Sequence, residues 1–77
     1  MSEKLVYTDS SRRQWVIGEN MMLGLERTVL ADFMQIKNGK PSGTIVRAVR
    51  REDVWYLTNP RKAEGIQLKP TSKTIEI

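Results

Sequence analysis

The sequence predicts an α+β domain that consists of an N-terminal β-hairpin, one central amphipathic helix and a C-terminal β-hairpin. Three observations favour this class. Short β-branched and aromatic runs occur towards both ends, an apolar stripe at helical spacing lies between them, and clusters of turn-forming residues separate the segments. The 77 residues leave room for one domain, so we expect residues 1–77 to form a single small basic domain.

The first hairpin is predicted by two short runs and the residues between them. Residues 5–8 and residues 14–17 carry the β-branched and aromatic side chains that strands prefer. Residues 9–11 are aspartate and serines, whose short side chains can hydrogen-bond to nearby backbone in a turn. The loop of this hairpin would expose Arg12 and Arg13.

A helix is predicted over residues 22–37. Its apolar side chains fall in one stripe when each residue turns by about 100°. Gly39 follows the last of them, and a glycine just past a helix end can adopt the left-handed cap without steric cost. We expect the stripe to lie in the core. Its members are Met22, Leu25, Val29, Phe33 and Ile36.

Residues 44–53 admit two interpretations. The first three are β-branched, as in a strand. Helical periodicity, by contrast, would separate the apolar and the basic side chains onto opposite sides. The helical interpretation leads to a winged helix-turn-helix-like arrangement and the extended one to a small β-meander, and both stay open.

The C-terminal hairpin is predicted by residues 54–58, which are mostly β-branched and aromatic, and by the alternating residues 66–69. A loop that begins at Asn59 and ends at Gly65 would join them. Residues 74–77 alternate as well, which predicts a short edge strand or a tail that becomes ordered on a partner.

The residue types missing from the chain argue against an enzyme. There is no histidine and no cysteine, so the most common general bases, nucleophiles and zinc ligands are absent. No glycine-rich segment has the spacing of a phosphate-binding loop. We therefore expect a binding protein that uses neither a metal nor a cofactor.

The apolar patterning argues against a membrane protein. No uninterrupted apolar run approaches the roughly 20 residues of a membrane span, and no apolar signal-peptide core follows Met1. We expect a cytoplasmic location. Because a chain this small has neither disulfides nor a zinc site to stabilise it, a homodimer stays open.

The basic side chains give the strongest indication of function. The net charge is +4 and the pI is about 9.8, and a basic surplus favours polyanions through counterion release. Arginine presents a fixed fork of donors that matches phosphate oxygens and guanine edges. We expect a regulator of transcription that binds nucleic acid, DNA rather than RNA. The predicted contacts are Thr44, Arg47, Arg50, Arg51, Arg61, Lys62, Arg12 and Arg13.

The two interpretations of residues 44–53 place these contacts differently. The helical layout is similar to a winged helix-turn-helix. This resemblance implies that the contacts in residues 44–51 face the major groove and that those at residues 61–62 meet the backbone or the minor groove. In the extended layout, the arginines and the pair Trp55 and Tyr56 would lie on an open sheet face suited to single-stranded nucleic acid.

Two segments near the N-terminus have the sequences Leu5-Val6-Tyr7-Thr8 and Trp15-Val16-Ile17-Gly18-Glu19. Together they resemble the opening strands of the CsrA family of RNA-binding translational regulators. The resemblance implies an RNA-binding translational regulator. Asp9 and Ser10 stand where that family carries basic residues.

A protein-binding module, acting as an inhibitor or an adaptor, is the alternative to a nucleic-acid-binding protein. Its contacts would be the loop with Arg12 and Arg13 and the strand at residues 74–77, because an edge strand can extend a partner's sheet. Arginine, tryptophan, tyrosine and methionine are enriched at protein interfaces. The same side chains therefore fit both hypotheses.

Overall fold

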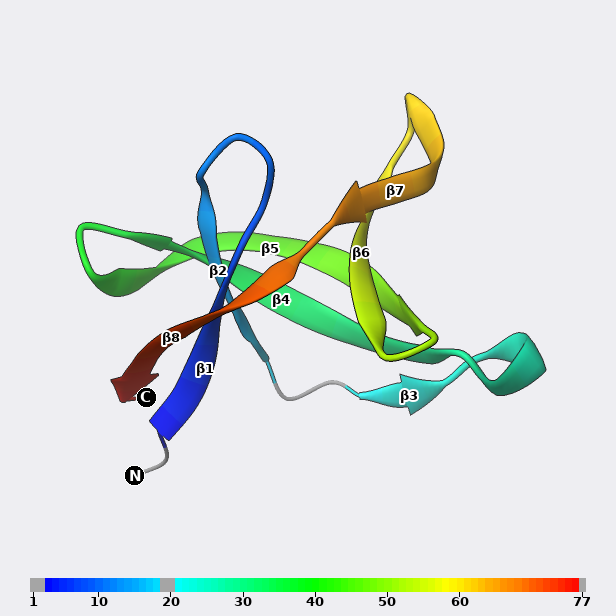
Figure 1. Ribbon diagram of the computed structural model, residues 1–77, viewed down its shortest axis with the longest axis horizontal. Coiled ribbons are helices and arrows are strands. Elements are labelled where there is room, and N and C mark those ends of the chain that lie inside the picture. Colours follow the sequence, from blue (N-terminus) through cyan, green and yellow to red (C-terminus); the bar gives the residue numbers. More distant parts are fainter. Residues whose placement is uncertain (1–2, 19–20, 77) are drawn as a thin grey trace.

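The computed structural model describes residues 3–18 and 21–76, and nearly all of this chain is β-sheet (Figure 1). Strands make up 74% of the described residues. The described residues contain no α-helix, only the 3-10 turn η1 (Leu25–Arg27). The predicted α+β class with a central helix is therefore wrong. Within the same residues, no helix has the length and apolar character needed to cross a membrane.

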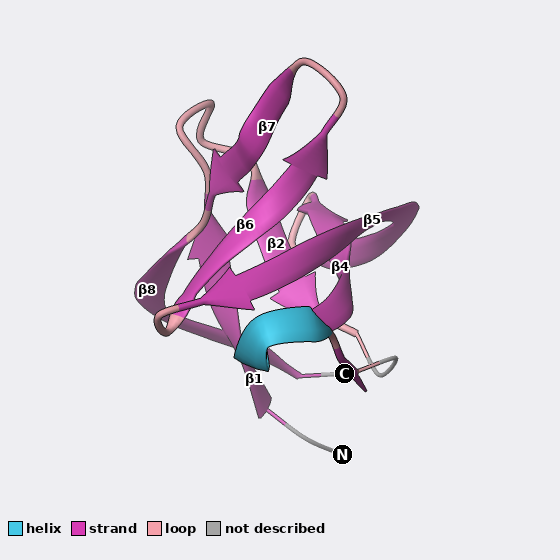
Figure 2. Cartoon of the chain, turned by 90° about the vertical axis from the view of Figure 1, so that its right-hand side faces the viewer, coloured by secondary structure: helices cyan, strands magenta, loops and turns pink. Residues whose placement is uncertain are grey.

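The strands form one antiparallel sheet with the order β7-β6-β5-β4-β2-β1-β8, and the short β3 pairs with the start of β4. The ends of this order, β7 and β8, are consecutive in the chain and are separated only by Leu68. The sheet therefore curls until its ends meet, and it encloses most of the core (Figure 2). The strands are β1 (Glu3–Thr8), β2 (Gln14–Ile17), β3 (Met22–Leu23), β4 (Val29–Lys37), β5 (Lys40–Arg51), β6 (Val54–Asn59), β7 (Lys62–Gln67) and β8 (Lys69–Glu76).

The predicted helix over residues 22–37 is wrong, because this segment forms β3, η1 and β4. Val29, Ala31 and Phe33 are all buried, which is the period of two that a strand requires. An irregularity in the pairing with β5 between Met34 and Ile36 then shifts the register, and Ile36 is buried as well. Alternation followed by a register shift produces the spacing of four and three residues that matches a helix.

The turn after β4 explains the rest of this error. Asn38 and Gly39 have φ angles of 54° and 75°. Two-residue hairpin loops with positive φ at both positions suit the twist of the flanking strands, and asparagine followed by glycine is their strongest sequence signal. The pair that fitted the end of a helix is therefore the turn between β4 and β5.

Residues 44–51 lie within β5, so their helical interpretation and the winged helix-turn-helix arrangement are also wrong. Arg50 pairs with Trp55 and Ala48 pairs with Leu57 across the β5–β6 hairpin. The first hairpin does form, with Val6 opposite Val16. Residues 74–76 of the predicted C-terminal strand pair with β1, and residue 77 lies outside the described residues.

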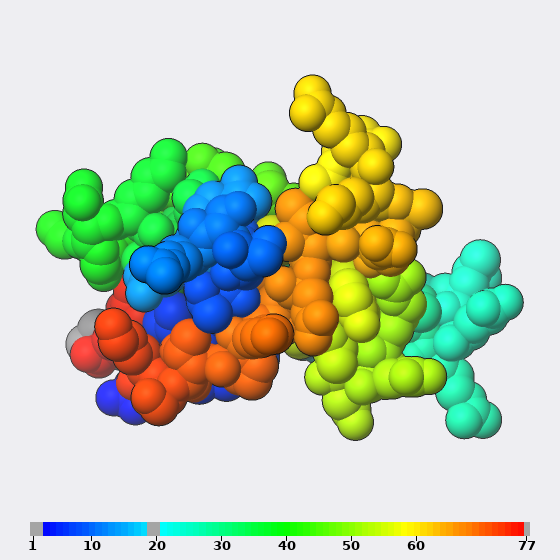
Figure 3. Space-filling model, turned by 45° about the horizontal axis from the view of Figure 1, so that its top comes forward, coloured from blue at the N-terminus to red at the C-terminus, as the bar shows by residue number. Residues whose placement is uncertain are grey.

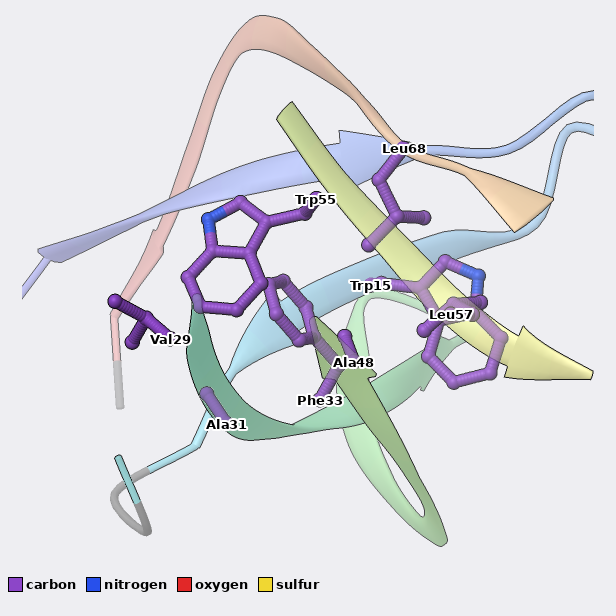
Figure 4. Close-up of a cluster of buried hydrophobic side chains, with 8 residues drawn as sticks. All are labelled: Trp15, Val29, Ala31, Phe33, Ala48, Trp55, Leu57 and Leu68. Atoms are coloured by element: carbon purple, nitrogen blue, oxygen red, sulfur yellow. The ribbon is translucent and has the colours of Figure 1, made fainter. Parts of the chain in front are cut away.

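The core has two clusters of buried side chains: a small one of Val6, Val16 and Ile36, and a larger one inside the curled sheet (Figure 4). The ring of Phe33 meets Trp55 at a centroid distance of 5.0 Å and Tyr7 at 5.5 Å, both edge to face. Full burial of each large side chain stabilises the fold by about 1.5–3 kcal/mol. The larger cluster consists of Trp15, Val29, Ala31, Phe33, Ala48, Trp55, Leu57 and Leu68.

Candidate functional site

Two loops lie together at one end of the curled sheet, the β1–β2 loop (residues 9–13) and the β6–β7 hairpin turn (residues 60–61), both at the top of Figure 1. They are neighbours because the closure of the sheet brings β7 beside the end of β1: Ser10 and Lys62 line the same hollow. We call this end of the molecule the loop end. It gathers Arg12, Arg13, Arg61 and Lys62, which the sequence places in two distant segments.

Two adjoining hollows run from the loop end along the junction of β7 and β8. One has a volume of about 320 Å³, and the other has about 230 Å³ and shares Gln67 and Lys69 with it. We call the two hollows together the cationic groove, because Arg50, Lys62 and Lys69 line it. The first hollow is lined by Thr8, Asp9, Ser10, Lys62, Gly65, Ile66, Gln67 and Lys69, and the second adds Tyr7, Arg50, Asp53, Val54, Trp55, Leu68 and Pro70.

No cation of the cationic groove forms an ion pair within the described residues. The ion pairs found there join Arg13 to Asp9 and Arg47 to Asp32, and neither uses a cation of the groove. Arg50 instead lies over the ring of Trp55, at 5.8 Å from its centre. Three cations thus face solvent in a concave surface.

The β1–β2 loop is held in shape by the buried carboxylate of Asp9, whose side chain is fully covered. Its Oδ1 accepts hydrogen bonds from the backbone N–H groups of Ser11 and Arg13, at 2.9 and 3.0 Å. Its Oδ2 accepts from Nε of Arg13 at 2.8 Å and from Nε1 of Trp15 at 3.0 Å. The loop wall of the groove is therefore fixed by four hydrogen bonds.

These contacts also set the charge of Asp9. Burial is the largest single influence and raises the pKa, but the hydrogen bonds from Trp15, Arg13 and Ser11 together outweigh it and hold the pKa of Asp9 below its ordinary 3.8. The carboxylate is ionised at neutral pH and is paired with Arg13. Asp9 therefore adds little net negative charge to the groove it lines.

The predicted arginines of β5 are mostly held by their neighbours. Nε of Arg47 lies 3.5 Å from Oδ1 of Asp32. The guanidinium of Arg51 lies 4.3 Å from the centre of the Tyr56 ring, and it also donates a hydrogen bond to a backbone carbonyl of β7. Arg47 and Arg51 thus contact neighbouring groups of the protein. The arginines of β5 therefore do not form one continuous basic surface.

The other predicted residues have different environments. Arg50 and Lys62 meet in the cationic groove. Arg12 and Arg61 are exposed at the loop end. Thr44 is exposed on β5, where its N–H donates to Oγ of Ser42, and it lies outside the groove. Arg13 is paired with Asp9, as described above.

Sequence reasoning missed Lys69, Gln67 and the hydroxyls of Thr8 and Ser10 as parts of the site. The alternation of residues 66–69 does predict that Gln67 and Lys69 share the exposed face of a strand. Their meeting with Ser10 depends on the closure of the sheet, which no local pattern reports.

A second surface feature is an exposed apolar segment at β3 and η1. Leu23 and Leu25 are 88% and 87% exposed, and Met21 and Met22 are 57% and 43% exposed. Figure 3 shows this segment standing out from the body of the molecule. Exposed apolar clusters of this kind are typical of interaction sites.

The comparisons with known proteins leave the site to be interpreted from its geometry. No family model, curated protein or solved structure matches the chain. The resemblance of residues 5–8 and 15–19 to the CsrA family gains no support from them, and Glu19 lies outside the described residues. Within the part of the chain that the structure describes, no three histidine, cysteine, aspartate or glutamate side chains gather as metal ligands.

Proposed function

We propose that this chain is a non-enzymatic module that binds single-stranded nucleic acid along the cationic groove. The observation that supports this most is that Arg50, Lys62 and Lys69, from three different strands, line adjoining hollows without a paired carboxylate. Cations in such an array bind phosphates because each contact releases counterions. The hydroxyl and amide groups of the same hollows can donate to phosphate and sugar oxygens.

The shape of the groove favours a single strand over a duplex. The α-helix that one interpretation of residues 44–53 would place in the major groove of a duplex is absent from residues 44–51. Hollows of about 320 and 230 Å³ lie at or below the lower end of ligand pockets, which span about 300–1,000 Å³. They suit successive parts of a thin chain better than one large ligand.

Fluorescence anisotropy tests this function directly. Labelled single-stranded RNA, single-stranded DNA and duplex DNA of equal length are titrated with the protein at low and at near-physiological salt. We expect the single strands to bind more tightly than the duplex. Three phosphate contacts predict a slope of about −2 for log K against log salt. No binding at low salt, or a preference for the duplex, would contradict the proposal.

A second function, docking on a protein, is favoured by the exposed apolar segment. Among the described residues, β3 pairs only with β4, so its other edge can accept a strand while Leu23 and Leu25 contact an apolar surface of the partner. The double variant Leu23→Ser/Leu25→Ser should then lose a stoichiometric partner in pull-downs from nuclease-treated extract. Retention of the partner by this variant would exclude the segment as the contact.

A further inference from the structure

We propose that a third hollow beside the cationic groove is a subsite for a guanine base. This inference rests on the proposed function, because a nucleic-acid strand must first lie in the groove. The hollow has a volume of about 200 Å³ and adjoins the groove at Ile66, which lines both. It is lined by Arg13, Trp15, Val46, Leu57, Thr58, Asn59, Pro60 and Ile66.

The walls of this hollow are mainly apolar. Val46, Leu57, Pro60 and Ile66 provide apolar contacts of the kind that hold an unstacked base. Ile66 separates this hollow from the two lysines of the groove. A strand whose phosphates follow the lysines can therefore turn one base across Ile66 into the third hollow.

Asn59 lines the hollow, and its side-chain amide carries hydrogen-bond donors. Its Oδ1 accepts from the backbone N–H of Arg61 at 2.8 Å. Because an N–H group can only donate, this contact assigns the oxygen of the amide and leaves Nδ2 as the other end. Nδ2 makes no side-chain hydrogen bond within the described residues. It is a donor that a ligand can use.

Arg13 contributes the remaining donors. Its Nε donates to Asp9, and its guanidinium lies over the ring of Trp15 at 5.8 Å from the centre. The two terminal nitrogens carry only donors. The hydroxyl of Thr58 donates its hydrogen to the carbonyl oxygen of Arg47 at 3.0 Å, and the alternation of side chains along β6 turns Thr58 away from Leu57.

The free donors of Arg13 and Asn59 favour a base edge that carries acceptors. Guanine presents O6 and N7 side by side, and arginine meets this pair with two parallel hydrogen bonds. Adenine has N7 but replaces O6 by an amino group, so a donor would face a donor. The subsite should therefore take guanine in preference to adenine.

The experiment compares thymidine oligonucleotides of equal length that carry one central guanine, adenine or 2-aminopurine. We expect the guanine strand to bind more tightly than the adenine strand, by a factor on the order of ten. 2-Aminopurine lacks O6, so its strand should bind as weakly as the adenine strand. Equal affinity of all three strands would overturn the subsite and leave the groove intact, whereas no binding of any strand would overturn the proposed function.

A variant of Asn59 completes the test. Asn59→Asp keeps an acceptor for the N–H of Arg61 but replaces the free donor by an acceptor, so the ratio of guanine to adenine affinity should fall towards one. Asn38→Asp, in the exposed β4–β5 turn, makes the same change of charge and should leave the ratio unchanged. Circular dichroism checks that both variants fold. A ratio that survives Asn59→Asp would contradict the assignment.

Discussion

Arg47 and Arg51 of β5 are each held by a neighbouring side chain, whereas Lys62 and Lys69 of the cationic groove have no such partner among the described residues. The arginines form the denser run in the sequence. The lysines come from β7 and β8 and meet beside the end of β1. The density of basic residues along the chain therefore does not measure the positive charge that is available to a ligand.

Replacement of Asp9 should have the largest effect on stability, because its carboxylate binds Arg13 and holds the β1–β2 loop in shape. Asp9→Ala removes four hydrogen bonds and leaves Arg13 and Nε1 of Trp15 without their partner. We expect a loss of about 3 kcal/mol in the free energy of unfolding, measured by chemical denaturation. Glu64→Ala removes an exposed carboxylate and is the control, with an expected change within about 0.5 kcal/mol. Equal midpoints for the two variants would contradict this role of Asp9.

The contribution of the Asp9 carboxylate to stability should also depend on pH. The pKa of Asp9 is lower in the folded protein than its ordinary 3.8, so its contribution to stability is fully present above that value and is lost as the pH falls through the folded pKa. The difference in unfolding free energy between the wild type and Asp9→Ala should be constant near neutral pH and should shrink below 3.8. A difference that persists unchanged in strong acid would argue against an ionised Asp9.

Replacement of Gly65 should have the next largest effect on stability, because this glycine allows β7 to bend beside the groove. Its φ is +83°, and an added Cβ would lie 2.5 Å from the carbonyl oxygen of Leu57. We expect Gly65→Ala to destabilise the protein by about 2 kcal/mol and to weaken binding in the groove. Gly43→Ala is the matched control, since a Cβ there meets nothing within 4 Å. Thermal unfolding compares them, and equal melting temperatures would refute the constraint.

Replacement of Arg47 should have the smallest effect on stability and on binding. Its ion pair with Asp32 is long and half exposed, and exposed pairs contribute about 0–1 kcal/mol. Arg47→Ala should therefore cost at most about 0.5 kcal/mol and leave affinity for single strands nearly unchanged. Denaturation and anisotropy measure the two quantities. A large loss of affinity would move the binding surface from the groove to β5.

Local chemistry was enough to predict the first hairpin, since residues 9–11 form the turn and the flanking runs pair as expected. It failed between residues 22 and 37. The register shift near Ile36 imitated helical spacing, and Asn38 with Gly39 fits both a helix end and a hairpin turn. Pairing with β2 and β5 decides between these outcomes, and such pairing is not encoded in a local pattern.

The site was predictable only in part for the same reason. Arg61 stands in a turn that the sequence indicates, whereas Lys62 begins β7, where the sequence predicts a loop that ends at Gly65. The alternation of residues 66–69 exposes Lys69. The position of these residues beside Ser10 follows from the pairing of β8 with β1. That contact joins the two ends of the chain, so the groove exists only once the sheet closes.

The most direct test of the central claim compares two double variants that each remove two positive charges. They are Lys62→Ala/Lys69→Ala in the groove and Arg47→Ala/Arg51→Ala on β5, and the measurement is the salt dependence of binding to single-stranded nucleic acid. We predict that the groove variant flattens the slope of log K against log salt by about 1.4, two contacts of about 0.7 each, and that the β5 variant keeps the wild-type slope. An equal loss in both variants, or a loss only in the β5 variant, would contradict the claim that the cationic groove carries the binding.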